Sequence, residues 1–225
     1  MKLILCIITY LILAIPAKSQ SSEPIFTITQ DTIKNNDKFI IPFFFEDEKT
    51  TSHLFRFDSI TSKSGQYSYT VKLSNYEGCE NDGGYFRIIE IISNNKTLLQ
   101  LRQSDGWNIL PRSVITFSPN KYFLTIHLNE NTTALVFTGY PYNNEPELIT
   151  IIVLHKNTAK LVFNQNMLIN KMTQENELFC LTLHDSVIEY LGHKNANTTN
   201  ILQIWKENGT LKFGGPYGIA RNNFN

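Results

Sequence analysis

Hydrophobic and polar residues alternate with a period of two along much of the chain. The clearest segment is Gln66–Ser74, in which apolar residues occupy every second position. Successive side chains of a strand point to opposite faces, so this pattern predicts a half-buried strand. Lys121–Leu128 repeats the pattern, and Thr133–Thr138 follows it after a turn-rich stretch. These last two segments are predicted to form a hairpin.

Further short apolar runs are bounded by turn-forming residues. They are Ile25–Ile28, Phe39–Phe45, Leu54–Phe57, Tyr85–Ile92, Leu98–Arg102, Val114–Phe117, Leu148–Leu154, Ala159–Phe163, Leu178–Leu183, Val187–Leu191, Ile201–Trp205 and Leu211–Phe213. No helical periodicity separates them. Their length and spacing predict an all-β fold, an antiparallel sandwich or barrel.

One polar segment, Gln165–Glu177, interrupts the strand pattern and predicts a linker or a single helix. We place a domain edge there. Residues 24–164 are then the main β-sandwich. Residues 165–225 are a C-terminal β extension that packs on it, because the segment is too short for an independent sandwich.

Composition supports a folded β protein. The chain is 42% hydrophobic, 12% aromatic and 18% charged, and it has only six Ala among 225 residues. Enough apolar residues are present to exclude intrinsic disorder, and the scarcity of Ala disfavours helix. The formal charge is zero, so no basic surplus points to a nucleic-acid partner.

The N-terminus predicts secretion. Residues 1–19 contain Lys2, an apolar run from Leu3 to Ile15 and the small-residue pattern Ala17-Lys18-Ser19. This is typical of a cleaved signal peptide, with an uncleaved anchor as the alternative. Later apolar runs are only strand-length, so no transmembrane segment is expected in the mature chain. The protein is therefore expected to be secreted or extracellular.

Cysteines and sequons fit an oxidising compartment. Cys79 and Cys180 remain after the signal peptide is removed, and they can form one disulfide or stay as two buried thiols. Four Asn-x-Thr sequons lie between strand-like runs, where a glycan can face solvent. Their asparagines are Asn95, Asn131, Asn197 and Asn208.

Motifs for catalysis and metal binding are missing from the sequence. The five histidines share no ligand spacing, and no nucleotide-binding or hydrolase motif occurs. The acidic segment Glu77–Gly84 is interpreted as a tight turn rather than a calcium loop. We expect no metal, no cofactor and no enzymatic activity. A hydrolase with two facing carboxylates stays open as an alternative.

Two adjoining pieces of sequence resemble galectins. The segment Leu101–Trp107 resembles the galectin pattern V-x-N-S followed by Gly and Trp, and Trp107–Arg112 resembles W-x-x-E-x-R. The resemblance loosely covers residues 24–164. It implies a two-sheet jelly-roll sandwich of the galectin type.

The resemblance also implies a sugar site made of Trp107, Arg112, Arg102 and Gln103. Trp107 would stack on the apolar face of galactose, and Arg112 would be the arginine of the motif. Leu110 stands where galectins have glutamate, and Gln103 stands where they have asparagine. Tyr85–Ile92 holds no counterpart of the upstream H-x-N-P-R.

The sequence thus predicts a secreted, non-enzymatic binding module for a glycan or glycoprotein, with altered or lost galactoside specificity. The alternative is a secreted protein-interaction or structural β-sandwich without sugar binding. A polar groove around Trp107 would favour the lectin. An exposed apolar patch that includes Leu110 would favour the alternative.

Overall fold

The computed structural model of this chain describes residues 24–29, 31–43, 54–76, 85–139, 148–175, 178–185, 199–207 and 210–214. Most of these residues form strands, and every pairing between the named strands is antiparallel. The prediction of an all-β, antiparallel protein is therefore confirmed.

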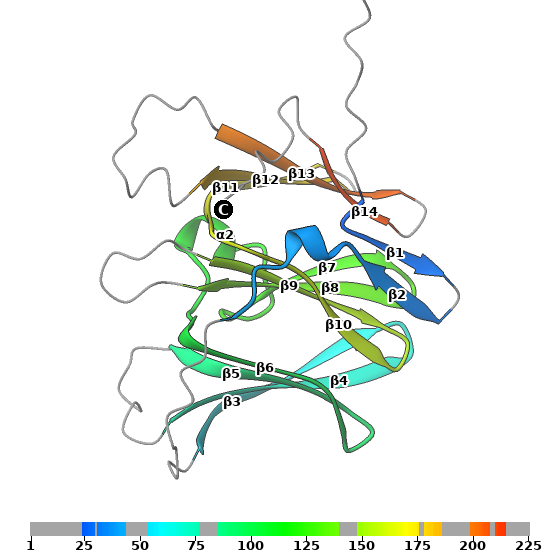
Figure 1. The fold of residues 1–225 in the computed structure, drawn as a ribbon, viewed down its shortest axis with the longest axis vertical. Helices are drawn as coiled ribbons and strands as arrows, with labels where there is room; N and C mark the ends of the chain where they lie inside the picture. The colour runs from blue at the N-terminus through cyan, green and yellow to red at the C-terminus, as the bar shows by residue number, and fades with distance from the viewer. Residues whose placement is uncertain are drawn as a thin grey trace, which may run out of the picture.

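The strands form three four-stranded sheets and a two-stranded ribbon, stacked as layers in Figure 1. The lower sheet contains β3 (Leu54–Ser64), β4 (Tyr67–Tyr76), β5 (Phe86–Ser93) and β6 (Lys96–Trp107). The middle sheet contains β7 (Leu124–Asn129), β8 (Thr132–Gly139), β9 (Leu148–His155) and β10 (Thr158–Gln165). The upper sheet contains β11 (Met167–Glu175), β12 (Leu178–Asp185), β13 (Thr199–Glu207) and β14 (Thr210–Gly214). The ribbon pairs β1 (Phe26–Thr29) with β2 (Thr32–Asn35).

The middle sheet is buried on both faces. All eight residues of β8 are buried. Alternate side chains point to opposite faces, so Ala134 and Val136 belong to one core while Leu135 and Phe137 belong to another. β8 and β9 are therefore apolar over most of their length instead of alternating with polar residues.

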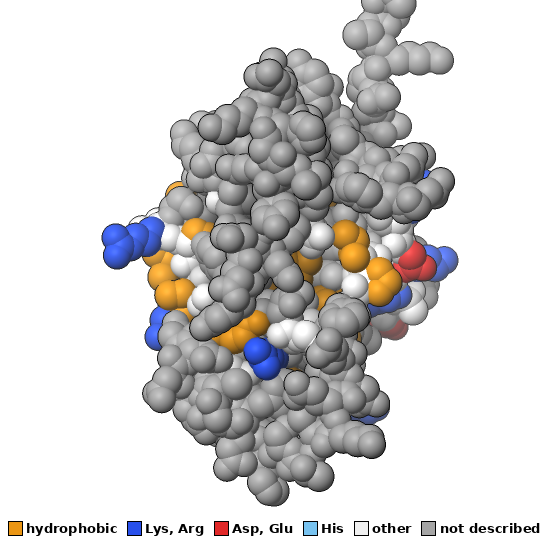
Figure 2. Space-filling view, turned by 60° about the vertical axis from the view of Figure 1, so that its left-hand side comes forward, with side chains coloured by type: hydrophobic (Ala, Val, Ile, Leu, Met, Phe, Trp, Pro, Cys, Tyr) orange, Lys and Arg blue, Asp and Glu red, His pale blue; other side chains and the backbone are white. Residues whose placement is uncertain are grey.

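The upper core lies between the middle sheet, the ribbon and β11, and the lower core lies between the middle and lower sheets. The upper core contains Ile25, Phe26, Ile33, Leu110, Leu124, Ile126, Leu128, Ala134, Val136, Ile149, Ile151, Val153, Val162, Phe163, Met167 and Ile169. The lower core contains Tyr69, Val71, Leu73, Phe86, Ile89, Ile91, Leu101, Trp107, Tyr122, Phe123, Leu135, Phe137, Ile152 and Leu154. On the face drawn in Figure 2, described hydrophobic side chains form a band at the height of the middle sheet, with Lys and Arg at the margins.

Strand order differs from that of a jelly roll. Within each sheet, hydrogen-bonded neighbours are consecutive in the chain, which makes each sheet a meander. A jelly roll instead contains Greek-key connections that bring distant strands together. The predicted hairpin of Lys121–Leu128 with Thr133–Thr138 is present as β7 and β8.

Three local predictions are corrected. Gln165–Glu177 is neither a linker nor a helix, because β11 covers most of it and pairs with β12 along its length. Val114–Phe117 is not a strand, and its first residues belong to the short helix α2 (Arg112–Ile115). Phe39–Phe45 begins in the 3-10 helix η1 (Asp37–Phe39), and Ile40 makes only an isolated bridge.

The chain passes from the middle to the upper sheet close to residue 165, and the predicted domain edge there stays a prediction. β10 ends at Gln165 and β11 begins at Met167.

Several predictions fall outside the described residues. These include the signal peptide of residues 1–19, Cys79, Asn197 and Asn208. The Cys79–Cys180 disulfide therefore stays a prediction, although Cys180 itself lies in β12. Within the part of the chain that the structure describes, no helix has the length and hydrophobicity needed to cross a membrane.

Candidate functional site

Trp107 is a core residue rather than a sugar platform. It is 0% exposed, its ring stacks on Phe86 at 6.1 Å between centroids, and Phe43 meets it edge-on at 5.6 Å. Its Nε1 donates a hydrogen bond of 2.9 Å to Thr150 Oγ1. A sugar can stack only on an indole face that is open to solvent, so this placement corrects the predicted role of Trp107.

The hydrogen bond of Trp107 begins a buried polar chain through the middle sheet. Thr150 Oγ1 donates to Asn164 Oδ1 at 2.8 Å, and Asn164 Nδ2 donates to the carbonyl of Ile41 at 2.7 Å. The Ile41 N–H donates back to the Asn164 carbonyl at 2.9 Å. The chain thereby satisfies buried polar groups and ties β6, β9, β10 and the N-terminal segment together.

Gln103 also has a structural role. β6 bulges opposite β5 between residues 102 and 107, and Gln103 lies inside the bulge. Gln103 is 4% exposed and donates through Nε2 to the Gly106 carbonyl at 2.5 Å. Gly106 has a φ of 72°, and a Cβ there would lie 2.6 Å from Cζ of Tyr85. The bulge therefore needs glycine at this position, and the Gln103 amide closes it.

The remaining predicted site residues are exposed and separate. Arg102 lies on β6, Arg112 begins α2, and both side chains face solvent. No hydrogen bond, ion pair or ring contact joins any two of Trp107, Gln103, Arg102 and Arg112, whose side chains are all described. Leu110 is 2% exposed in the upper core, so it contributes to no surface patch. The four residues thus do not assemble into the implied sugar site.

Two described carboxylates are engaged in pairings along the surface. Glu90 forms an ion pair with Lys72 at 2.9 Å and accepts a hydrogen bond from the Gln100 amide at 2.9 Å, across neighbouring strands of the lower sheet. Asp31 pairs with Lys156, and the hydrogen bond and charge of that lysine lower the pKa of Asp31. Within the described residues, no group of three His, Cys, Asp or Glu side chains could hold a metal ion.

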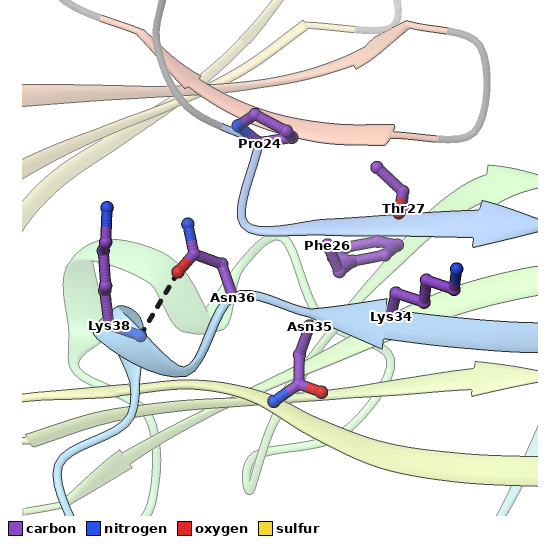
Figure 3. A pocket seen from close by; sticks show the side chains of 7 residues that line it. All are labelled: Pro24, Phe26, Thr27, Lys34, Asn35, Asn36 and Lys38. Carbon is purple, nitrogen blue, oxygen red and sulfur yellow. Dashed lines mark hydrogen bonds between the residues drawn. The ribbon is translucent and has the colours of Figure 1, made fainter.

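A shallow pocket of about 340 Å³ lies along the ribbon, where β1 runs beside β14. Figure 3 draws the residues of its described lining, with Lys34 and Lys38 at opposite ends and Asn35 pointing away from Asn36. They are Pro24, Phe26, Thr27, Lys34, Asn35, Asn36 and Lys38. The pocket thus combines two ammonium groups, two amides and a hydroxyl on one short stretch of chain.

The amides of this pocket are held in place by their own neighbours. Asn35 Nδ2 donates to Asp37 Oδ1 at 2.6 Å, and Asn36 Oδ1 accepts from the backbone N–H of Lys38 at 3.3 Å. Asn36 is also the N-cap of η1. In Figure 3 the Asn36 Nδ2 and the Lys38 Nζ lie on the same side. Fixed amides lose less conformational entropy when a ligand binds.

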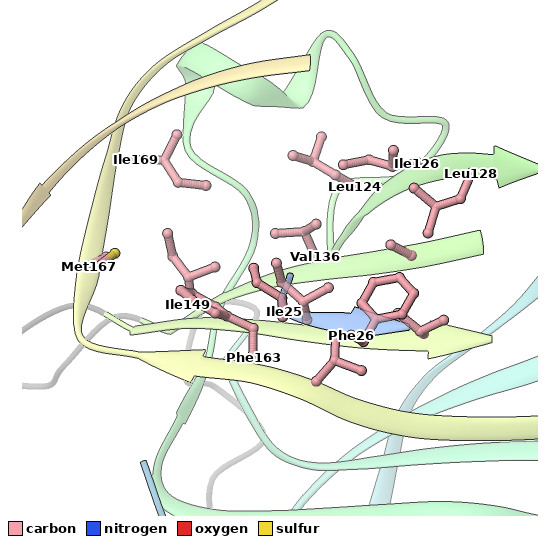
Figure 4. Close-up of a cluster of buried hydrophobic side chains, with 14 of the residues drawn as sticks. Ile25, Phe26, Leu124, Ile126, Leu128, Val136, Ile149, Phe163, Met167 and Ile169 are labelled. Carbon is pink, nitrogen blue, oxygen red and sulfur yellow. The ribbon is translucent and has the colours of Figure 1, made fainter. Parts of the chain in front are cut away.

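The floor of the pocket is anchored in the upper core. Phe26 is 1% exposed, and Figure 4 places it among the apolar side chains of the middle sheet, beside Ile25. Lys160 of β10 donates to the Ile33 carbonyl at 3.0 Å, which fixes β2 from below. The ribbon is therefore held by apolar burial on one face and presents polar groups on the other.

Sequence reasoning missed this pocket. The run Lys34–Lys38 is polar throughout and has no period, so the hydrophobic pattern predicts no element there. A usable signal was the density of amide and ammonium side chains in five residues beside an apolar strand. Comparison of the sequence and structure with family models, curated proteins and solved structures finds no match. The galectin resemblance thus rests on the sequence pattern alone.

Proposed function

We propose that this protein is a secreted, non-enzymatic binding module for carbohydrates, and that the ribbon pocket holds the ligand. The observation that carries the proposal is the lining of the pocket. Amide, hydroxyl and ammonium groups are the donors and acceptors that sugar hydroxyls need. The apolar wall near Pro24 gives the C–H groups of a sugar a surface to pack against.

The charge of the pocket supports one class of carbohydrate. Lys34 and Lys38 both line it, and its described lining includes no carboxylate. Hydrogen bonds between ammonium groups and anionic oxygens are roughly twice as strong as neutral ones. We therefore propose a sugar that bears a carboxylate or sulfate group. Its binding is expected to weaken as salt increases, because the two ammonium groups are exposed.

This proposal replaces the site implied by the galectin resemblance. Trp107 and Gln103 stabilise the fold, and Arg102 and Arg112 stand apart from the pocket lining. The protein-interaction alternative rests on the replacements at Leu110 and Gln103, and the exposed apolar patch that would favour it does not include Leu110, which is buried. The proposal keeps the predicted secreted location, for which residues 1–19 are the support.

A glycan array tests the proposal. The full mature chain is screened beside Lys34→Gln/Lys38→Gln and beside a matched control, Lys63→Gln/Lys121→Gln, which removes the same charge from exposed lysines elsewhere. Acidic glycans are expected to bind the wild type and the control, and to lose at least about tenfold in affinity with the pocket variant, which corresponds to ~1.4 kcal/mol. Absence of binding, or equal binding by all three proteins, refutes the proposal.

A further inference from the structure

The structure describes two of the four sequons, and both lie in hairpin turns. Asn95 lies in the turn between β5 and β6, where Asn94 and Asn95 have φ values of 50° and 60°. Positive φ at both central residues is typical of a type I′ turn, which points its side chains away from the sheet. Asn95 and the sequon threonine, Thr97, are both exposed. The Asn95 sequon stays open after folding.

The Asn131 sequon is enclosed by neighbouring turns. The Asn131 N–H donates to Asn129 Oδ1 at 3.0 Å, and the Asn131 carbonyl accepts from the Lys156 N–H at 3.2 Å. On its other side lies Gly65 of the β3–β4 turn, where an added Cβ would stand only 2.8 Å from Asn131 Oδ1. The amide of Asn131 is thus packed between two hairpins.

The two threonines of this second sequon, Thr132 and Thr133, are buried. Thr133 is 0% exposed, and its hydroxyl lies 3.2 Å from His127 Nδ1 and 3.5 Å from the Lys63 carbonyl. The Thr132 hydroxyl lies 2.8 Å from Nδ1 of His155. Folding therefore buries both threonines of the Asn131 sequon and leaves Asn131 only partly exposed, while the Asn95 sequon stays in solvent.

We propose that the secreted protein carries an N-linked glycan on Asn95 and none on Asn131. In the transfer, the Asn95 amide nitrogen bonds to the anomeric carbon of an oligosaccharide carried by a polyprenyl diphosphate. The bond from that carbon to the diphosphate oxygen breaks, and the lipid diphosphate leaves. The amide nitrogen gives up one proton, and no oxidant or reductant is needed.

Sterics separate the fates of the two sites. A sugar on Asn131 would occupy the space that the Gly65 turn needs, so a chain modified there could not close the β3–β4 turn onto the β7–β8 turn. Such chains would fail to fold and would be retained. Asn95 is exposed, so a sugar on it can extend into solvent.

The inference rests on the secretion that the proposed function includes, and the experiment removes that dependence. The chain from residue 20 onward is expressed behind a proven secretory leader in a eukaryotic host. Glycosidase release in ¹⁸O-labelled water, followed by peptide mass spectrometry, marks each asparagine that carried a glycan. We expect label at Asn95 and none at Asn131. Secreted protein with an unmodified Asn95, or with label at Asn131, overturns the inference.

Two variants give an independent readout on deglycosylated protein. Asn131→Gln is expected to lower the melting temperature by about 2–4 °C or more, because the longer side chain crowds the Gly65 turn. Asn95→Asp removes the other sequon with a residue that tolerates the φ of 60°, so it is expected to leave the melting temperature unchanged. Equal melting temperatures for both variants would overturn the assigned structural role of Asn131. Wild-type protein that lacks a glycan at Asn95 but binds acidic glycans would refute this inference and leave the proposed function intact. Wild-type protein that carries the Asn95 glycan but binds no acidic glycan would refute the proposed function alone.

Discussion

Replacement of Trp107 separates a core role from a ligand role. The indole is fully buried, contacts Phe43 and Phe86, and donates one hydrogen bond to Thr150. Trp107→Ala removes the ring and leaves a cavity between the lower and middle sheets. Large-to-small changes of buried aromatic residues cost ~3–5 kcal/mol, so we expect a loss of unfolding free energy of that size.

A milder variant isolates the hydrogen bond. Trp107→Phe keeps an aromatic ring in the lower core but removes the donor to Thr150. In this variant the Thr150 hydroxyl still donates to Asn164, but it loses the indole N–H from which it accepts a hydrogen bond. Loss of one buried hydrogen bond costs ~1–3 kcal/mol when a group is left unsatisfied. We expect Trp107→Phe to fall in this range, below the cost of Trp107→Ala.

Urea unfolding followed by far-UV circular dichroism measures both variants, because it avoids the loss of tryptophan fluorescence. Thr150→Val and the double variant Trp107→Phe/Thr150→Val complete a cycle, and a coupling energy of ~0.5–3 kcal/mol is expected for residues in contact. A cost below ~0.5 kcal/mol for Trp107→Ala, as exposed positions give, would refute the core assignment. Acidic-glycan binding by folded Trp107→Phe is expected to equal that of the wild type.

Four further predictions concern stability. Gly65→Ala should cost ~1–2 kcal/mol of unfolding free energy from its φ of 59° alone. The added Cβ would also lie 2.1 Å from the backbone oxygen of Glu130 in the β7–β8 turn, which is a clash. Wild-type stability in urea unfolding would contradict this prediction. Ile126→Ala should cost ~2–5 kcal/mol in the same assay, and a cost near zero would refute its place in the upper core. Tyr69→Phe should leave the unfolding free energy unchanged or raise it by up to ~1 kcal/mol. The Tyr69 hydroxyl is desolvated, since burial raises its pKa to about 12, and it has no hydrogen-bond partner among the described residues. A clear loss of unfolding free energy would indicate a partner. Lys156 lowers the pKa of Asp31 in the folded state, so the Asp31–Lys156 pair stabilises the protein above the unfolded-state pKa of Asp31, and this stabilisation is lost as the pH falls through the folded-state pKa. The melting temperatures of wild type and Asp31→Asn should therefore converge in acid. A constant difference would refute the pairing.

Strand positions were predictable where one face of the strand meets solvent. In β4, Tyr69, Val71 and Leu73 are buried while Ser68 is exposed, so the period of two is visible in the sequence. β7 follows the same rule, with Ile126 buried and His127 exposed. Its hairpin with β8 was also predictable, because turn residues separate two runs of the right length.

Elements with other environments were not predictable in the same way. Met167–Glu175 is polar over most of its length, yet it forms β11 because its neighbour β12 pairs with it residue by residue. Such pairing is a long-range property that a local pattern does not contain. α2 is only four residues long, too short for a helical period to be recognised. Strand order within the sheets was likewise set by hairpin pairing rather than by any single segment.

The failure of the galectin-derived site has the same physical origin. A Gly-Trp pair at the end of a strand is compatible both with a binding loop and with a strand that leaves its sheet. The local sequence alone does not distinguish these two structures. Here the residue after Trp107 bridges to β8, which draws the indole between two sheets. Whether an aromatic side chain is buried depends on what packs over it, in this case Phe43 from a distant segment.

The placement of the proposed pocket follows from how the ribbon is held. Two strands of four residues are too short to be stable alone, so the ribbon exists only because Phe26 and Ile33 are buried against the middle sheet. That burial uses one face of each strand, and side chains of the opposite face, such as Lys34, point away from the core. The cost of ordering the binding groups is therefore met by the core, and the ligand has only to match donors that are already in place. A ligand site built this way depends on core stability as much as on its own polar residues.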